Sequence, residues 1–381
     1  MIDDRDGCPG LRGAIDAIDA IGPLDEAAMA AAAAHLGRLT KPPGSLGRLE
    51  ELVVAVAGIT GRPDAPVDRR VIVVAAGDHG VARQGVSAYP SAVTPQMVAN
   101  FVEGGAAINV LAAASGASVI VVDVGVANPV PRVRRHPRRG GRLIRARVAD
   151  GTADMTEGPA MERAAACRAI DVGIRLVEQL RSEGGLDLLG VGEMGIGNTT
   201  SASALVAALT GEPVARVTGR GTGIDDRTHA RKVAAIKQSL AVNRPDPDDP
   251  IGVLAAVGGL EIAALVGLTL GAAAARIPVV LDGFITGAAA LVAAAIAPGL
   301  PPRLIAAHRS TEPGHSIVLE RLGLRPYLDL DLRLGEGSGA ALAIGLIVAA
   351  CRIRDEMATF ESAAVSGPVE GASAAIRATS G

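Results

Sequence analysis

The sequence predicts an α/β fold with a mostly parallel six-stranded sheet that carries helices on both faces. Six short β-branched runs each end in glycine or a polar cluster, and helical segments separate them, which is typical of buried parallel strands. The chain has 381 residues, of which 49% are hydrophobic and 20% charged, enough for a sizeable packed core. The six runs are VIVVAAGDHGV (71–81), SVIVVDVGVAN (118–128), LDLLGVGEMGIGNTT (186–200), IPVVLDGF (277–284), RLIAAHRST (303–311) and LDLDLRLGEGSG (328–339).

Two helices are expected before the sheet. Residues 24–39 are rich in alanine and are predicted to form a helix. The helix should end before Lys41-Pro42-Pro43-Gly44, because the two prolines lack a backbone N–H donor and fix φ. A second, amphipathic helix is predicted over residues 46–59. Lys41 is interpreted as a solvated lysine of the turn.

Composition argues against nucleic-acid and membrane partners. The formal net charge of -3 gives no long-range attraction for nucleic acid. Eight arginines lie between residues 132 and 147 without interleaved aromatics, so this segment is predicted to be an exposed basic loop. The apolar runs 262–275, 340–351 and 285–302 are too short or too broken by proline to span a bilayer, and we expect them to be buried helices of a soluble protein.

Cysteine usage and the chain start suggest a cytoplasmic protein. The opening residues MIDDRDGCPG have neither the basic nor the apolar region of a secretory signal. Cys8, Cys167 and Cys351 are widely separated, and their spacing predicts neither a disulfide framework nor a zinc site.

Glu336 is the strongest candidate for chemistry. It lies between Gly335 and Gly337, after the alternating run 328–333 and before the apolar run 340–350. This order predicts a turn between strand and helix at the edge of the sheet where α/β proteins bind ligands. A carboxylate there disfavours a bare phosphate but suits removal of a proton from a ring nitrogen. The alternative is that Glu336 only caps the following helix and favours its dipole.

A glycine-rich turn follows the third run. Gly195 and Gly197 let a ligand approach the backbone, and the hydroxyl-rich segment 198–201 should begin a helix, so the turn is a candidate phosphate site. It is not a Walker loop, because no lysine follows the glycines in the required pattern. Ordinary N-capping by Asn198 and Thr199 is the alternative.

Two more polar clusters follow. Asp225-Asp226 has no preceding strand, so we assign it no ligand, whereas Lys232 on the next predicted helix could reach an anion. The segment 308–315 ends a run and supplies Ser310 and Thr311. No metal site is expected, because the histidines show no ligand spacing, and no cofactor is predicted.

Seven motifs, in this order, closely resemble the nicotinate-nucleotide:dimethylbenzimidazole phosphoribosyltransferase family: KPPGSLGRLE, GDHGV, VTPQMVANF, GVGEMGIGNTT, TGIDD, LDGF and RLGEGSGAALA. The resemblance extends from about Leu24 to Arg354. It implies an α/β catalytic domain over residues 63–338 and a small helical domain built from the chain ends, 1–62 with 339–381. It also implies a homodimer.

The resemblance further implies a reaction and a set of site residues. The family transfers the phosphoribosyl group of nicotinate mononucleotide to 5,6-dimethylbenzimidazole, in assembly of the cobalamin nucleotide loop. Glu336 matches its general base. The positions matching its phosphate and ribose site are Glu193, Gly195, Gly197, Asn198, Thr199, Lys232 and Ser310, and those matching its benzimidazole pocket are Tyr89, Met97 and Leu334.

Three other functions are considered. A phosphoribosyltransferase or nucleoside phosphorylase acting on a purine would need hydrogen bonds to the polar edges of that base. A nucleotide-sensing module would have kept the phosphate site and lost the chemistry, which the presence of Glu336 argues against. A Rossmann-type NAD site is weaker, because GxGxxG is absent after the first run.

Overall fold

A computed structural model describes residues 8–221 and 223–367. The chain divides into two compact units. The larger unit takes the described residues within 1–24 and 67–346, and the smaller unit takes those within 25–66 and 347–381. The larger unit contains the sheet and the smaller one is helical.

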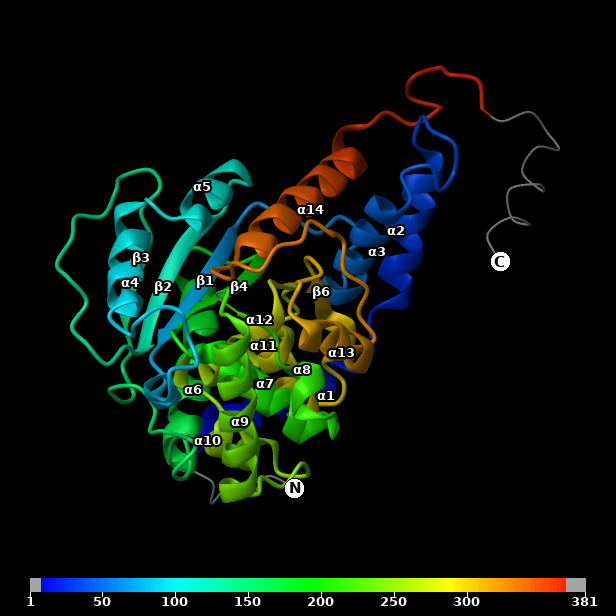
Figure 1. Ribbon diagram of the computed structural model, residues 1–381. Coiled ribbons are helices and arrows are strands. Elements are labelled where there is room, and N and C mark those ends of the chain that lie inside the picture. The colour runs from blue at the N-terminus through cyan, green and yellow to red at the C-terminus, as the bar shows by residue number, and fades with distance from the viewer. Residues whose placement is uncertain (1–7, 222, 368–381) are drawn as a thin grey trace. The chain divides into compact units, whose positions relative to one another are not determined.

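The predicted parallel sheet is confirmed, and its strand order is β3-β2-β1-β4-β5-β6 (Figure 1). Every neighbouring pair is parallel. The central strands are buried because their β-branched side chains point alternately to two covered faces. The strands are β1 (Arg70–Gly77), β2 (Ser118–Gly125), β3 (Arg142–Arg145), β4 (Leu188–Met194), β5 (Val279–Leu281) and β6 (Leu304–Ala306).

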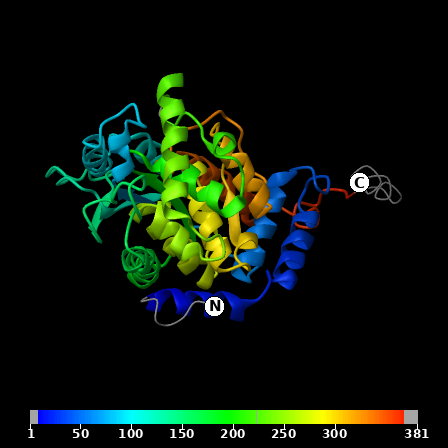
Figure 2. The same ribbon diagram turned by 60° about the horizontal axis from the view of Figure 1, so that its bottom comes forward.

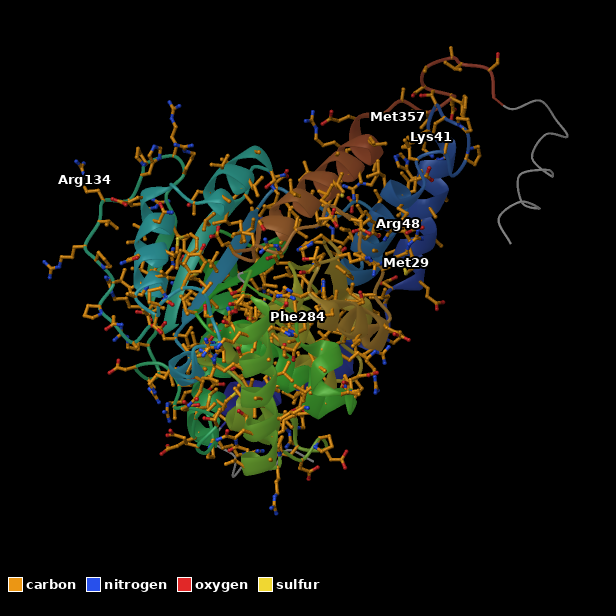
Figure 3. All side chains as sticks on the ribbon, in the orientation of Figure 1. Met29, Lys41, Arg48, Arg134, Phe284 and Met357 are labelled. Carbon is orange, nitrogen blue, oxygen red and sulfur yellow. A yellow bond between two sulfur atoms is a disulfide. The ribbon has the colours of Figure 1, made fainter. Side chains whose placement is uncertain are left out.

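One of the six predicted strands is wrong. Residues 328–333 form no strand, and Leu328 makes only an isolated bridge to His308. Asp331 has a φ of 53°, in the left-handed region, which breaks an extended chain. The sixth strand is instead β3, within the arginine-rich segment that we predicted to be a loop. The rest of that segment is irregular and largely exposed, and in Figure 3 Arg134 extends outward from it.

Helices cover both faces of the sheet. On one face, α11 (Leu260–Ala274) packs against β1, β2 and β4 and is itself covered by α6 (Arg163–Glu183). All residues of α11 from Leu260 to Ala273 are buried, which confirms the predicted core helix. On the other face lie α4 (Val93–Glu103), α5 (Ala107–Ala114) and the start of α14 (Ser338–Glu356), whose Ile344 lies near Ile72 of β1. The further helices are α7 (Asn198–Thr210), α8 (Val214–Val217), α9 (Asp226–Asn243), α10 (Pro250–Val257), α12 (Phe284–Ile296), α13 (Pro313–Leu322), and the short 3-10 turns at Gly80–Gln84 and Pro301–Arg303.

By length and composition alone, Val93–Ala114 could cross a membrane, but half of it is buried in the protein. Gly104, with φ 79°, ends α4, and α5 begins only at Ala107. The stretch is therefore two core helices. Buried helices of globular proteins pass the same test, so this stretch is weak evidence for a span.

Helix α1 (Pro9–Ile21) corrects two sequence interpretations. We assigned residues 1–62 to the small domain, but α1 packs against α6 and α11 of the larger unit through the buried Leu11 and Ile18 (Figure 2). Cys8 and Cys167 form a disulfide, which we did not expect. The two lie 159 residues apart in sequence, yet their Cα atoms are 4.9 Å apart, because sequence spacing does not measure distance in a fold.

We expect the disulfide to stabilise the larger unit. Replacing Cys8 with serine should lower the free energy of unfolding by about 2–4 kcal/mol, because the cross-link restricts a long loop of the unfolded chain. Urea unfolding with and without dithiothreitol measures this, since the reductant should weaken only proteins that hold the cross-link. Cys351→Ala is the matched control, because Cys351 is a free, buried cysteine. Equal unfolding midpoints for wild type and Cys8→Ser would contradict the prediction.

In the smaller unit, α2 (Glu26–Arg38) packs on α3 (Arg48–Thr60), and Leu39 forms an isolated antiparallel β-bridge with Thr359. Our interpretation of Lys41 as a solvated lysine is wrong. Its side chain is buried, and its Nζ lies 2.7 Å from Glu50 Oε1. The turn after the two prolines folds back onto the first turn of α3, which closes the lysine in. Lys41 therefore has a structural ion pair within this unit.

Candidate active site

A cavity of about 410 Å³ opens at the carboxyl ends of β4, β5 and β6, within the larger unit. It contains most of the residues that the sequence singled out, although they come from segments far apart in the chain. Gly197 and Lys232 are predicted site residues that do not line it. Those that do are Tyr89, Met97, Glu193, Gly195, Asn198, Thr199, Ser310, Leu334 and Glu336.

Glu336 lies in the turn before α14 with a φ of 64°, a conformation that costs a non-glycine residue energy. Its carboxylate accepts a backbone hydrogen bond from Ile108 at the start of α5, and Oε2 has no partner among the described residues. Burial raises the pKa of Glu336 to about 7. The hydrogen bond from Ile108 acts to lower this pKa, and the negative charge of Asp282 acts to raise it. Such a carboxyl can accept a proton near neutral pH.

Glu336 accepts from Ile108 rather than from α14, so the capping part of the alternative is wrong. Asp282, directly after β5, caps α14 instead. Its Oδ1 accepts hydrogen bonds from the N–H groups of Gly339 at 2.6 Å and Ala340 at 3.2 Å, and Oδ2 accepts one from Gly337 at 3.1 Å. The sequence analysis missed Asp282, although an acid directly after a buried run was a usable signal.

Glu193 is the last but one residue of β4 and lies beside Glu336. Asn198 donates a hydrogen bond to it, and Gly335 leaves space for it, because a Cβ there would lie against Glu193 Oε1. Burial, together with the nearby charges of Asp282, Glu261 and Glu336, raises the pKa of Glu193 to about 8. At neutral pH Glu193 is therefore mostly protonated and can donate a hydrogen bond to an anion.

The glycine-rich turn between β4 and α7 is tightly packed. A Cβ on Gly195 would lie 2.3 Å from the carbonyl oxygen of Gly77, so only glycine fits there. Gly197, with φ 99°, is the N-cap of α7, and no side chain caps this helix. Capping by Asn198 or Thr199 is thus wrong: Gly197 is the N-cap, Asn198 donates to Glu193, and both Asn198 and Thr199 line the cavity.

Lys232 of α9 lies behind the cavity wall. It is fully buried, and its Nζ donates to Thr199 Oγ1 at 2.8 Å and to the carbonyl of Gly219 at 3.4 Å. Burial lowers its pKa to about 8, and the charge of Glu312 opposes this. A Cβ on Gly221 would lie 3.4 Å from Nζ, so a glycine stands between the ammonium and the cavity. Asp225 caps α9 by accepting from the N–H of Thr228.

The loop after β6 brings Ser310 and Glu312 to the cavity. Ser310 donates its N–H to His315 Nδ1 at 2.9 Å, and burial, with the charges of His308 and Arg309, lowers the pKa of His315 to about 3, so this histidine is neutral. Glu312, which the sequence analysis missed, accepts from the N–H of Gly221 at 2.7 Å. Its Oε2 has no partner among the described residues.

Part of the cavity wall is apolar. Tyr89, Met97 of α4 and Leu334 line it together with Phe284 and Ile285 of α12. Tyr89 and Leu334 are both more than half exposed, so they lie at the mouth. This wall and Glu336 border the same space, which can hold a flat apolar ring beside a proton acceptor. Within residues 8–221 and 223–367, no three His, Cys, Asp or Glu side chains are grouped to hold a metal ion.

A parallel sheet whose strand ends hold a glycine turn, a helix start and a titratable carboxyl is typical of α/β enzymes that bind phosphorylated ligands. The comparisons agree, since a family model described as phosphoribosyltransferase matches residues 21–365. A nicotinate-nucleotide–dimethylbenzimidazole phosphoribosyltransferase of Chloroflexus aggregans is 59% identical over 86% of this chain and 91% of its own, and one of Roseiflexus sp. is 58% identical over 87% and 92%.

A solved structure extends the match to the fold. The crystal structure of nicotinate-nucleotide-dimethylbenzimidazole phosphoribosyltransferase from Thermus thermophilus superposes with a TM-score of 0.82, at 47% identity, over 91% of this chain and all of that one. The chain belongs to the nicotinate-nucleotide–dimethylbenzimidazole phosphoribosyltransferase family. This confirms the resemblance that the motifs indicated.

Proposed function

We propose that this protein transfers the phosphoribosyl group of nicotinate mononucleotide to 5,6-dimethylbenzimidazole. The products are α-ribazole 5′-phosphate and nicotinate, and the step belongs to assembly of the cobalamin nucleotide loop. The observation that carries the proposal is the buried Glu336 carboxyl, with an unpaired oxygen and a pKa of about 7, in a cavity bordered by an apolar wall and a glycine turn. The names of the relatives supply the substrates.

In the proposed reaction the benzimidazole nitrogen attacks C1′ of the ribose from the face opposite the nicotinate. The bond from C1′ to the pyridine nitrogen breaks, and because this nitrogen carries positive charge in the nucleotide, it leaves neutral with the electron pair. Attack from the opposite face turns a β-nucleotide into an α-nucleotide. The second ring N–H of the benzimidazole becomes acidic as the new bond forms, and Glu336 accepts that proton.

The remaining site residues are proposed to hold the substrates. Gly195, Asn198, Thr199 and Ser310 would bind the phosphate and ribose, and Glu193, as a neutral acid, would avoid repelling the phosphate. Gly197 and Lys232 would act from behind the wall, through the start of α7 and through Thr199. A fixed sugar keeps the attack in line.

Tyr89, Met97 and Leu334 are proposed to contact the benzimidazole. Their apolar surfaces suit a dimethylated ring, and methionine adapts to its shape. The family resemblance also supports a homodimer that acts on small molecules. The composition supports a cytoplasmic protein with no nucleic-acid or membrane partner.

Mass spectrometry of the products tests the function. The purified protein is incubated with nicotinate mononucleotide and, separately, with benzimidazoles, purines and phenols. We expect release of nicotinate and the mass of the α-nucleotide with dimethylbenzimidazole. Faster transfer to adenine would instead support a purine enzyme, and no release of nicotinate with any acceptor would support a sensing module.

Lys232→Ala should weaken binding of nicotinate mononucleotide by about 10- to 100-fold, because Thr199 loses its partner and the buried charge of Glu312 is no longer balanced. Isothermal titration calorimetry measures the dissociation constant. Lys237→Ala, on an exposed part of the same helix, is the control and should bind normally. A dissociation constant unchanged by Lys232→Ala would reject the role.

The reaction should slow in acid. Because the pKa of Glu336 is raised to about 7, its carboxylate form is lost as pH falls through that value, and kcat/KM should fall about tenfold for each pH unit below it. A pH profile of kcat/KM from pH 5 to 8 measures this. A profile that stays flat down to pH 5 would show that the base titrates with an ordinary carboxyl pKa, or is another group.

A further inference from the structure

A buried polar network lies below the cavity and has no role in the mechanism above. His79 follows β1, Ser201 lies in the first turns of α7, and Glu261 in the first turn of α11. His79 Nε2 is 2.6 Å from Glu261 Oε1, and Nδ1 is 3.0 Å from Ser201 Oγ. All three residues are at most 3% exposed, and none lines the cavity. The motif GDHGV, which contains His79, is thus still unexplained by function.

The network is also hydrogen-bonded to the loop before α11. Ser201 Oγ lies 3.1 Å from the carbonyl oxygen of Gly258, which can only accept, and 3.0 Å from His79 Nδ1. The hydrogen bond between His79 Nε2 and Glu261 Oε1 is buried, where a low dielectric strengthens it.

The glycine-rich turn rests directly on this pair. A Cβ on Gly195 would lie 3.3 Å from Glu261 Oε1 and 3.4 Å from His79 Cδ2, and one on Gly197 would lie 3.2 Å from His79 Cβ. From below, a Cβ on Gly259 would lie 2.3 Å from His79 Cε1. His79 therefore packs against both glycines of the turn, alongside Gly77 and Ala82.

We propose that His79 and Glu261 are positioning residues for the reaction: they hold the turn of residues 195–197 under the substrate phosphate and set the charge that Glu193 experiences. This inference rests on the proposed function for its phosphate. The pair does not line the cavity, and Ser201 ties it to α7, whose first residues Asn198 and Thr199 do.

The charge effect depends on the groups that face Glu193 and the pair. Burial is the largest cause of the raised pKa of Glu193, followed by Asp282, Glu261 and Glu336, with the Asn198 hydrogen bond opposing. Asp78 faces the pair from the end of β1, and burial raises its pKa as well. Removing the carboxylate of Glu261 should therefore make Glu193 easier to ionise.

Glu261→Gln tests the charge effect, because it keeps the shape and a hydrogen bond to His79 but removes the acid. The δ-carbon of Glu193 is followed by NMR in protein labelled with [5-¹³C]glutamate, and its signal is identified by its loss in Glu193→Gln. We expect its titration midpoint to move down by about half to one pH unit. Thr269→Val, a buried change in the same helix that removes a hydroxyl donating to Leu265 O at 2.7 Å, should leave the midpoint unmoved.

Binding of ribose 5-phosphate tests the positioning effect without turnover. Glu261→Ala should raise its dissociation constant on the order of 10- to 100-fold, because the turn is displaced, whereas Glu261→Gln should stay within about threefold of wild type. Circular dichroism confirms that each variant is folded. If Glu261→Ala misfolds, His79→Gln, which keeps a donor toward Glu261, replaces it.

The outcomes separate this inference from the proposed function. An unmoved Glu193 midpoint in Glu261→Gln, or equal weakening of ribose 5-phosphate binding by Gln and Ala, would overturn the inference even if wild type performs the transfer. Wild type that performs no transfer would instead reject the proposed function, while the NMR titration would still report on the pair.

Discussion

Replacing Glu336 with glutamine is expected to lower kcat by about 100- to 10,000-fold while nicotinate mononucleotide still binds, because the amide cannot accept the benzimidazole proton. The variant preserves shape and the Ile108 contact, so binding should change little. Single-turnover assays with dimethylbenzimidazole measure the rate, and calorimetry measures nucleotide binding. Glu320→Gln, at an exposed position of α13, is the control.

The backbone of Glu336 supports this assignment. A left-handed glutamate between two glycines is strained, and such strain persists where function requires the side chain. Near-normal turnover by Glu336→Gln would remove Glu336 from its role, and Glu193 would become the next acid to test. Loss of nucleotide binding equal to the loss of rate would show that Glu336 holds the substrate rather than a proton.

Replacing Asp282 with alanine should cause a large loss of stability. Three N–H groups at the start of α14 would lose their acceptor in a buried place, and each buried donor left unpaired costs about 1–3 kcal/mol. Allowing for water that enters the space, we expect the free energy of unfolding to fall by about 2–4 kcal/mol. Urea unfolding followed by circular dichroism measures it.

Two comparisons make the Asp282 experiment specific. Asp282→Asn keeps one acceptor oxygen and should lose less than alanine does. Asp329→Ala, whose side chain is well exposed, should change the free energy of unfolding by less than about 0.5 kcal/mol. If Asp282→Ala is as stable as Asp329→Ala, the carboxylate does not support α14.

The predictions that the structure confirms depend on local sequence patterns, whereas those that are wrong depend on contacts between distant parts of the chain. The central strands β1, β2 and β4 and the core helix α11 followed from runs of β-branched or apolar residues, because local propensity and burial agreed there. The run 328–333 has the same alternation but forms no strand, because no neighbouring strand pairs with it beyond the bridge at Leu328. Lys41 was predicted to be solvated because no local pattern shows that the turn folds back and places Glu50 beside it.

By itself the sequence determined five of the six strands, the glycine turn, the catalytic candidate Glu336 and, through its motifs, the family. Only the tertiary structure decided that Asp282 caps α14, that Lys232 stands behind the cavity wall, that Cys8 meets Cys167, and that His79 and Glu261 support the turn. The physical reason is that periodicity and turn residues act over a few neighbours. Hydrogen bonds and buried charges depend on distances between segments that lie tens to hundreds of residues apart, and folding alone sets those distances.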